Sequence, residues 1–219
     1  MLLTKQEFQE KLEKKILKIA FIGMSNTGKS FRSDELHDIE QFNYIHVDDE
    51  IEKDLNLSSM AEMAAWMGYP FDERYKKRGE KYLQLEEKHT QKKEYLETKN
   101  NFVLDTTGSV IYLSKQTKEY LQKNYLLILL DIEQDKLEDM KKLFFKEPKS
   151  VYWGNSFFQK DNEDNIDALK RCYPQLLEDR KNMYRDLADI IIPGEISQYK
   201  GLSIHRFLEI ISFALPDKK

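Results

Sequence analysis

The sequence is poor in several features, and each shortage excludes something. It has one cysteine, Cys172, so no disulfide can form within the chain, and nothing indicates an oxidising compartment. Its longest apolar run, residues 125–130, is far shorter than the roughly 20 residues that span a bilayer. Its four histidines are scattered, without the spacing of metal ligands. We therefore expect a soluble, cytoplasmic protein that does not bind membranes.

Positive charge is also in short supply. The 219 residues include 35 Lys+Arg and 39 Asp+Glu, which gives a formal net charge of −4. Because affinity for a phosphate backbone depends on a basic surface, this balance disfavours nucleic acid as a partner. Only seven of the basic residues are arginines, and residues 79–170 contain none. Since bidentate arginine contacts are strong ligands of phosphate groups, this gap disfavours a substrate that already carries phosphate.

Five short apolar runs alternate with segments of helical periodicity. Several of the runs are continuously apolar, as expected for parallel strands that are covered on both faces. The predicted strands are residues 17–23, 43–47, 101–105, 125–131 and 189–193. Strands that alternate with helices predict an α/β fold with a mainly parallel sheet.

The helical segments complete this prediction. We expect helices over residues 113–123, 133–145, 166–187 and 202–214, the third with a possible break near Pro174. The highly charged residues 71–99 predict a solvent-facing helix, with Gly79 as a candidate break. Residues 1–16 predict a helical extension. Because no repeat and no Gly/Ser/Pro linker interrupts the chain, we expect a single domain over residues 1–219.

Glycine is scarce, with eight residues where average usage would give about fifteen, and two of them lie in the clearest motif. Gly23-Met-Ser-Asn-Thr-Gly28-Lys29-Ser30 is a Gly-x-x-x-x-Gly-Lys-Ser sequence between a predicted strand and a helix. The backbone N–H groups of such a loop bind phosphate. Its lysine reaches the β- and γ-phosphates, and its serine hydroxyl binds Mg²⁺. We therefore predict ATP and Mg²⁺ as cofactors. The predicted nucleotide-binding residues are Gly23, Ser25, Asn26, Thr27, Gly28, Lys29, Ser30 and Phe31.

Four further segments, in the right order, resemble the shikimate kinase family of P-loop small-molecule kinases. Residues 46–52 look like its Asp-x-Asp-x-x-Ile-Glu, and residues 79–87 are similar to its Gly-Glu-x-x-Phe-Arg-x-x-Glu. Residues 107–109 occupy the place of its glycine cluster after the third strand, and residues 177–189 resemble its Glu-Arg-x-Pro-Leu-Tyr-x-x-x-Ala-Asp block. The resemblance covers about residues 17–193. It implies ATP-dependent phosphoryl transfer to a hydroxyl of a small molecule, with an altered acceptor site. It also implies a three-layer fold with a five-stranded parallel sheet of order 2-3-1-4-5, helices on both faces and a lid over about residues 138–160.

The resemblance also implies roles for single residues. Asp48 keeps the acid that contacts a substrate hydroxyl and can serve as a base, and Arg180 keeps a ligand of the substrate carboxylate. Gln84 stands where the family has a second arginine of that kind, and His46 replaces an acid that the family uses towards Mg²⁺. The predicted substrate-binding residues are Asp48, Gln84, Thr107, Gly108 and Arg180.

Asp105 ends an apolar run, which is the usual setting of a carboxylate that holds Mg²⁺. In the implied strand order the third strand lies beside the first, so Asp105 would stand near Ser30 and replace the acid missing at His46. We predict Ser30 and Asp105 as metal ligands, and Lys29, Asp48 and Asp105 as catalytic residues. Lys146 and Lys149 of the lid are candidates for neutralising the transferred phosphate.

Other interpretations stay open at this point. Asp48 and Asp105 are also suited to capping a helix or turn, and Arg180 to a solvated or ion-paired position. For the aromatic residues of 151–158 we favour packing over closure onto a substrate. The chain also fits a nucleotide-binding regulatory protein that has lost turnover, or a nucleoside or nucleotide kinase. The sequence leaves the acceptor, the oligomeric state and the role of the N-terminal extension open.

Overall fold

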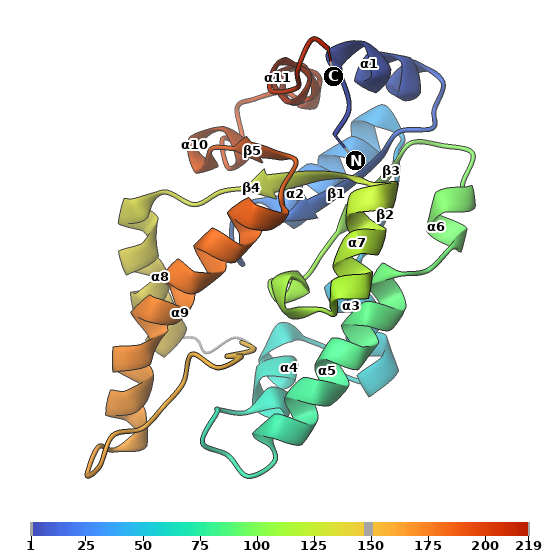
Figure 1. Cartoon of the computed structure of the whole chain (residues 1–219). Helices are drawn as coiled ribbons and strands as arrows, with labels where there is room; N and C mark the ends of the chain where they lie inside the picture. Colours follow the sequence, from blue (N-terminus) through green and yellow to red (C-terminus); the bar gives the residue numbers. More distant parts are fainter. Residues whose placement is uncertain (1, 147–150, 219) are drawn as a thin grey trace.

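The computed structural model describes residues 2–146 and 151–218, and it is built around one parallel sheet (Figure 1). The strands are β1 (Lys18–Ile22), β2 (Asn43–His46), β3 (Phe102–Asp105), β4 (Leu126–Leu130) and β5 (Ile190–Ile192). They pair in the order β2-β3-β1-β4-β5. The five predicted strands, their parallel pairing and the implied strand order are confirmed.

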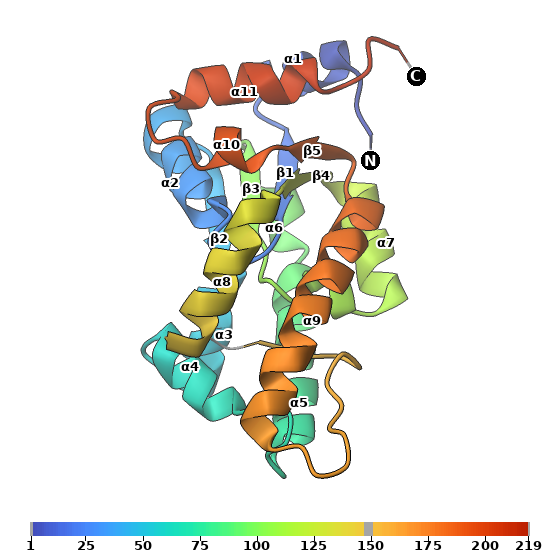
Figure 2. The same ribbon diagram turned by 90° about the vertical axis from the view of Figure 1, so that its left-hand side faces the viewer.

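Helices cover both faces of this sheet. Before β3 they are α1 (Lys5–Glu13), α2 (Lys29–Glu40), α3 (Val47–Leu55), α4 (Met60–Met67), α5 (Tyr75–Thr90) and α6 (Glu94–Glu97). After β3 they are the short 3₁₀ turn η1 (Val110–Tyr112), α7 (Lys115–Asn124), α8 (Gln134–Lys146), α9 (Asn165–Leu187), α10 (Gly194–Ser197) and α11 (Ile204–Phe213). Figure 2 shows α1 and α11 together at one end of the molecule, and α8 beside α9 on the other side of the sheet.

The pleat of the strands divides the core into two hydrophobic clusters. Ile19 and Phe21 of β1 face the cluster formed with α1, α2 and α11, whereas Ala20 and Ile22 face the cluster formed with α3, α5, α7 and α9. Successive side chains of a strand point to opposite faces, so a strand covered on both faces is apolar throughout. This is why the central strands have no polar alternation in the sequence.

Two helices differ from expectation. Helix α9 continues through Pro174, whose ring is exposed, because buried residues before and after it pack on the core. Helix α5 continues through Gly79, and the expectation that it faces solvent is wrong. One side of it is buried, including the polar residues Glu86 and His89. These polar groups are buried because they have hydrogen-bonding partners, as described below for Glu86. Among the described residues, no helix has the length and apolarity required to cross a membrane.

Arg32 of α2 fixes the segment after β5 against the phosphate loop. Its guanidinium is fully buried, pairs with Glu35 at 2.6 Å and donates hydrogen bonds to four backbone carbonyl oxygens, those of Ile196, Ser197, Tyr199 and Leu202. The hydroxyl of Ser197 in turn donates to the carbonyl oxygen of Thr27 at 2.9 Å. One buried side chain therefore connects two segments that are far apart in the sequence.

Replacing Arg32 by methionine is expected to lower the free energy of unfolding by about 3–5 kcal/mol, because Glu35 and the carbonyl groups lose a buried partner. Urea unfolding followed by circular dichroism measures this. Arg206→Met is the matched control, since Arg206 pairs with Glu209 on the surface and such pairs contribute less than about 1 kcal/mol. Equal losses in both variants would contradict the assigned role of Arg32.

Candidate functional site

The predicted phosphate loop connects β1 to α2 and depends on its glycines. Gly23 and Gly28 have φ values of +145° and +94°. A Cβ atom on Gly23 would lie 2.6 Å from the carbonyl oxygen of Leu130, and one on Gly28 would lie 3.0 Å from that of Ser197. Both positions therefore require glycine for conformation and for space. All eight predicted nucleotide-binding residues lie in this loop or in the first turn of α2.

Lys29 places its charge over the same loop. The side chain is 8% exposed, and its Nζ donates to the carbonyl oxygens of Gly23 and Met24 at 3.1 and 3.0 Å. The hydroxyl of Thr27 also donates to the Met24 carbonyl, at 2.9 Å. The ammonium group and the N-terminus of α2 together form a positive site of the kind that binds phosphate.

Strand order brings Asp105 to this loop, as predicted. The Ser30 hydroxyl donates to Asp105 Oδ2 at 2.6 Å, and His46 Nδ1 lies 2.8 Å from the same oxygen. Nε2 of His46 lies 3.0 Å from Asp34 Oδ1 on α2. Asp105 is 5% exposed, and its Oδ1 has no hydrogen-bonding partner among the described residues. Asp105 therefore contacts side chains of the phosphate-loop helix and of β2, and these contacts differ from those of a residue that caps a turn.

His46 is a cation at neutral pH in this position. Burial by itself lowers its pKa, but the hydrogen bond and the negative charge of Asp105, followed by those of Asp34, exceed this effect and raise the pKa to about 9. The residue that replaces an acid of the family thus makes a charge-assisted contact with Asp105. The sequence did not predict the contact between His46 and Asp105, because a single histidine at the end of a strand does not indicate which residues it will contact.

Asp48 lies on the first turn of α3 and faces the phosphate loop. It is not the N-cap residue of that helix, which is His46. Its Oδ1 accepts a hydrogen bond of 3.0 Å from the phenol of Tyr82 on α5. Burial raises the pKa of Asp48, and the positive charge of Lys29 opposes this rise. An acid between a buried phenol and the loop lysine is well placed to accept a proton.

A second buried carboxyl, that of Glu86, lies further along α5. It is fully buried, and its two oxygens contact the hydroxyls of Thr107 and Ser109, each at 2.5 Å. The intervening Gly108 offers its carbonyl oxygen to the Tyr184 phenol at 2.5 Å. The segment after β3 is thereby held between α5 and α9. The residues that hold it, Glu86 and Tyr184, were not among the predicted site residues.

Arg180 of α9 is a buried cation with an incomplete set of partners. It is 7% exposed, and its Nη2 donates to the carbonyl oxygen of Tyr152 at 2.6 Å. Its guanidinium lies 5.4 Å from the centre of the Tyr112 ring. No ion pair between described residues includes it, and its Nε has no hydrogen-bonding partner among them. Leaving such a group unpaired is costly, so Arg180 is suited to an anionic ligand.

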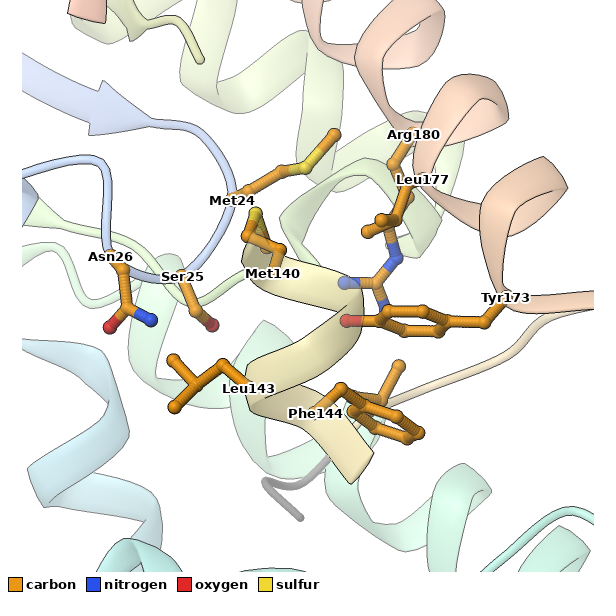
Figure 3. Close-up of a pocket in the computed structure, with 10 residues that line it drawn as sticks. Met24, Ser25, Asn26, Met140, Leu143, Phe144, Tyr173, Leu177 and Arg180 are labelled. Atoms are coloured by element: carbon orange, nitrogen blue, oxygen red, sulfur yellow. The ribbon is translucent and has the colours of Figure 1, made fainter. Parts of the chain in front are cut away.

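A small cavity of about 40 Å³ lies between the phosphate loop and helices α8 and α9 (Figure 3). Ser25 and Asn26 border it on the loop side, and Tyr173 and Arg180 extend into it from α9. Helix α8 supplies an apolar wall with Met140, Leu143 and Phe144. The cavity lies between the predicted phosphate loop and a buried cation that has no ion pair within the described part of the chain.

Not every predicted residue reaches this region. Gln84 is exposed, on the side of α5 opposite Tyr82 and Glu86, so the structure does not bring it together with Asp48 and Arg180. Lys146 ends α8 and is exposed, and Lys149 lies outside the described residues. Of the aromatic residues of 151–158, Trp153 packs as favoured, since it is 1% exposed with its ring 5.8 Å from that of Tyr173, whereas Phe158 is exposed.

The pKa of His46 makes a contribution to stability that depends on pH. Because the pKa is raised above its unfolded value of 6.5, the stabilisation is fully present below pH 6.5 and is lost as the pH rises through about 9. His46→Gln is expected to lower the free energy of unfolding by about 2 kcal/mol at pH 6, with a difference that shrinks towards pH 9. Urea unfolding across this range measures it. The control is His205→Gln, which removes an exposed pair with Glu40. If the difference in free energy of unfolding between the wild type and His46→Gln is the same at every pH, the raised pKa assigned to His46 is wrong.

Comparison with known proteins identifies the fold. No protein-family model matches the sequence, and no curated protein sequence matches it. Among solved structures, a shikimate kinase from Acinetobacter baumannii in complex with shikimate superposes with a TM-score of 0.57 at 18% identity, over 92% of this chain and 97% of that one. Shikimate kinases from Bacteroides thetaiotaomicron (TM-score 0.57, 15% identity, 89% and 98%) and Aquifex aeolicus (0.52, 16%, 90% and 97%) are similar to a comparable extent. The chain has the P-loop kinase fold of the shikimate kinases.

Proposed function

We propose that this protein transfers the γ-phosphoryl group of ATP to a hydroxyl of a small molecule that carries one anionic group. The observation that carries the proposal is the placement of two groups beside the phosphate loop: Asp48 lies near Lys29, and Arg180, which has no ion pair among the described residues, borders the cavity. The loop amides and Lys29 bind the phosphates and stabilise the charge on the transferring group. Arg180 binds the anionic group of the acceptor, and Asp48 orients its hydroxyl and accepts the proton.

The metal site is the second part of the proposal. Ser30 Oγ lies 2.6 Å from Asp105, and the buried, unpartnered Oδ1 of Asp105 is an oxygen ligand of the type that Mg²⁺ prefers, directly or through water. These residues fit the ion. When bound, Mg²⁺ neutralises charge on the β- and γ-phosphates.

The acceptor site supports a singly charged substrate. Arg180 is the described arginine that borders the cavity, and the remaining lining residues are largely apolar or aromatic. A phosphorylated acceptor normally requires several arginines. One of the similar structures contains shikimate, a hydroxylated monocarboxylic acid, and this chemistry is compatible with a single guanidinium. The exposed position of Gln84 removes one predicted contact, which favours an acceptor other than shikimate.

The test is ATP consumption by the purified protein with pools of small hydroxylated carboxylic acids. We expect ADP formation that requires both Mg²⁺ and one pool, and successive division of that pool identifies the acceptor. ATP binding without turnover on any pool would instead support the nucleotide-binding regulatory protein. Turnover that depends on a nucleoside monophosphate would contradict the singly charged acceptor.

Asp105→Asn is expected to weaken the affinity for Mg²⁺-ATP and to lower turnover by about 10- to 100-fold, because a carboxylate near the metal loses its charge. Calorimetric titration of ATP with and without Mg²⁺ measures the affinity. Asp38→Asn on the exposed side of α2 is the control and should behave as the wild type. If the affinity for Mg²⁺-ATP is unchanged in Asp105→Asn, the metal assignment is wrong.

A further inference from the structure

A chain of side-chain contacts links Asp48 to the second buried carboxyl, Glu86. The Tyr82 phenol donates to Asp48 Oδ1 at 3.0 Å, and it also lies beside the side chain of Thr107. Thr107 Oγ1 lies 2.5 Å from Glu86 Oε1. Two acids, one on α3 and one on α5, are thus connected through two hydroxyl groups.

The oxygens of this chain can accommodate a proton on Glu86. The backbone N–H of Ser109 donates to Thr107 Oγ1 at 3.0 Å, and the Ser109 hydroxyl donates to Glu86 Oε2 at 2.5 Å. If the carboxyl of Glu86 is protonated, it donates to Thr107, Thr107 donates to Tyr82, and Tyr82 donates to Asp48. Every hydroxyl proton then has an acceptor, and the free negative charge rests on Asp48.

The charges around the two acids favour the same distribution. Lys29 attracts negative charge to Asp48, although Asp105 and Asp49 oppose it. Glu86 faces Arg180 and the Tyr184 phenol across the segment after β3, and the Tyr82 phenol on its own helix, but it has no ion pair among the described residues. Burial raises the pKa of Glu86 to about 8, although the hydroxyls of Ser109 and Thr107 and the charge of Arg180 oppose the rise. Two ionised carboxylates in so buried a network would repel each other strongly.

We propose that Asp48 and Glu86 share one proton through Tyr82 and Thr107, and that Glu86 holds it while Asp48 is ionised to receive the acceptor hydroxyl. Glu86 is then a positioning residue, and this part of the inference rests on the proposed function. During transfer the acceptor O–H bond breaks and its proton passes to Asp48. The acceptor oxygen bonds to the γ-phosphorus, and the bond to the β–γ bridging oxygen breaks with its electron pair on ADP.

The first test needs no enzyme activity. Infrared spectroscopy of the wild-type protein should show the carbonyl stretch of a protonated carboxylic acid at pH 7, which disappears with a midpoint near pH 8. Glu86→Gln should remove this band. The matched control Glu87→Gln should keep it, since Glu87 on the same helix bonds to Ser114 and Thr117. A band that is absent from the wild type at pH 7, or that survives in Glu86→Gln, overturns the proposal.

Coupling between the two acids is tested with Asp48→Asn. Removing the charge of Asp48 removes a repulsion that disfavours ionised Glu86, so Glu86 should lose its proton more easily, and the midpoint of the band should fall by at least about one pH unit. A buried glutamate that only holds the segment after β3 would show no shift. An unchanged midpoint would overturn the shared proton, and this result does not depend on whether Glu86→Gln folds.

The pH profile of turnover connects the pair to the reaction. Loss of the shared proton places two negative charges beside the transferring group, so turnover should fall as the pH rises through about 8, and this fall should be absent from Glu86→Gln. A fall that is retained in Glu86→Gln contradicts the positioning role. If the protein transfers no phosphoryl group at all but shows the band and its shift in Asp48→Asn, the proposed function fails and the shared proton stands.

Discussion

The pairing of β3 between β1 and β2 is the constraint on which the site depends. Its register places Asp105 opposite Phe21 of β1 and opposite His46 of β2. Because parallel strands end at the same edge of the sheet, the phosphate loop after β1 and the helix after β2 begin beside Asp105. Ser30, His46 and Asp48 therefore meet around one carboxylate without being close in the sequence.

Charge compensation explains much of the remaining arrangement. Burying an ion is costly unless it is paired or hydrogen-bonded, and the site meets this cost in three ways. His46 lies between two carboxylates, Lys29 contacts backbone carbonyls, and Glu86 contacts two hydroxyls. Arg180, by contrast, has no ion pair with another described residue, and its Nε has no hydrogen-bonding partner among them. The guanidinium of Arg180 borders the cavity where we propose that the acceptor binds.

The sequence predicted the sheet and the position of Asp105 beside the phosphate loop better than it predicted the surroundings of Asp48 and Arg180. Apolar runs and a phosphate-loop motif are local signals, and strand order then places Asp105 beside Ser30. The positions of Tyr82 and Glu86 could not be predicted in this way, because a charged helix shows no obvious buried side. Tyr75, Gly79, Tyr82 and Glu86 do share one helical face, so the spacing contained a signal. Spacing alone does not distinguish a buried Glu86 from its neighbour Glu87, since only the partners on other elements make the difference.

The most direct measurement is a crystal structure of the protein with Mg²⁺ and a non-hydrolysable ATP analogue. We expect phosphates in the loop of residues 23–30, the metal on the Ser30 hydroxyl with Asp105 in its coordination shell or one water away, and the γ-phosphate facing Asp48. A nucleotide bound elsewhere, or a metal remote from both Ser30 and Asp105, would contradict this expectation.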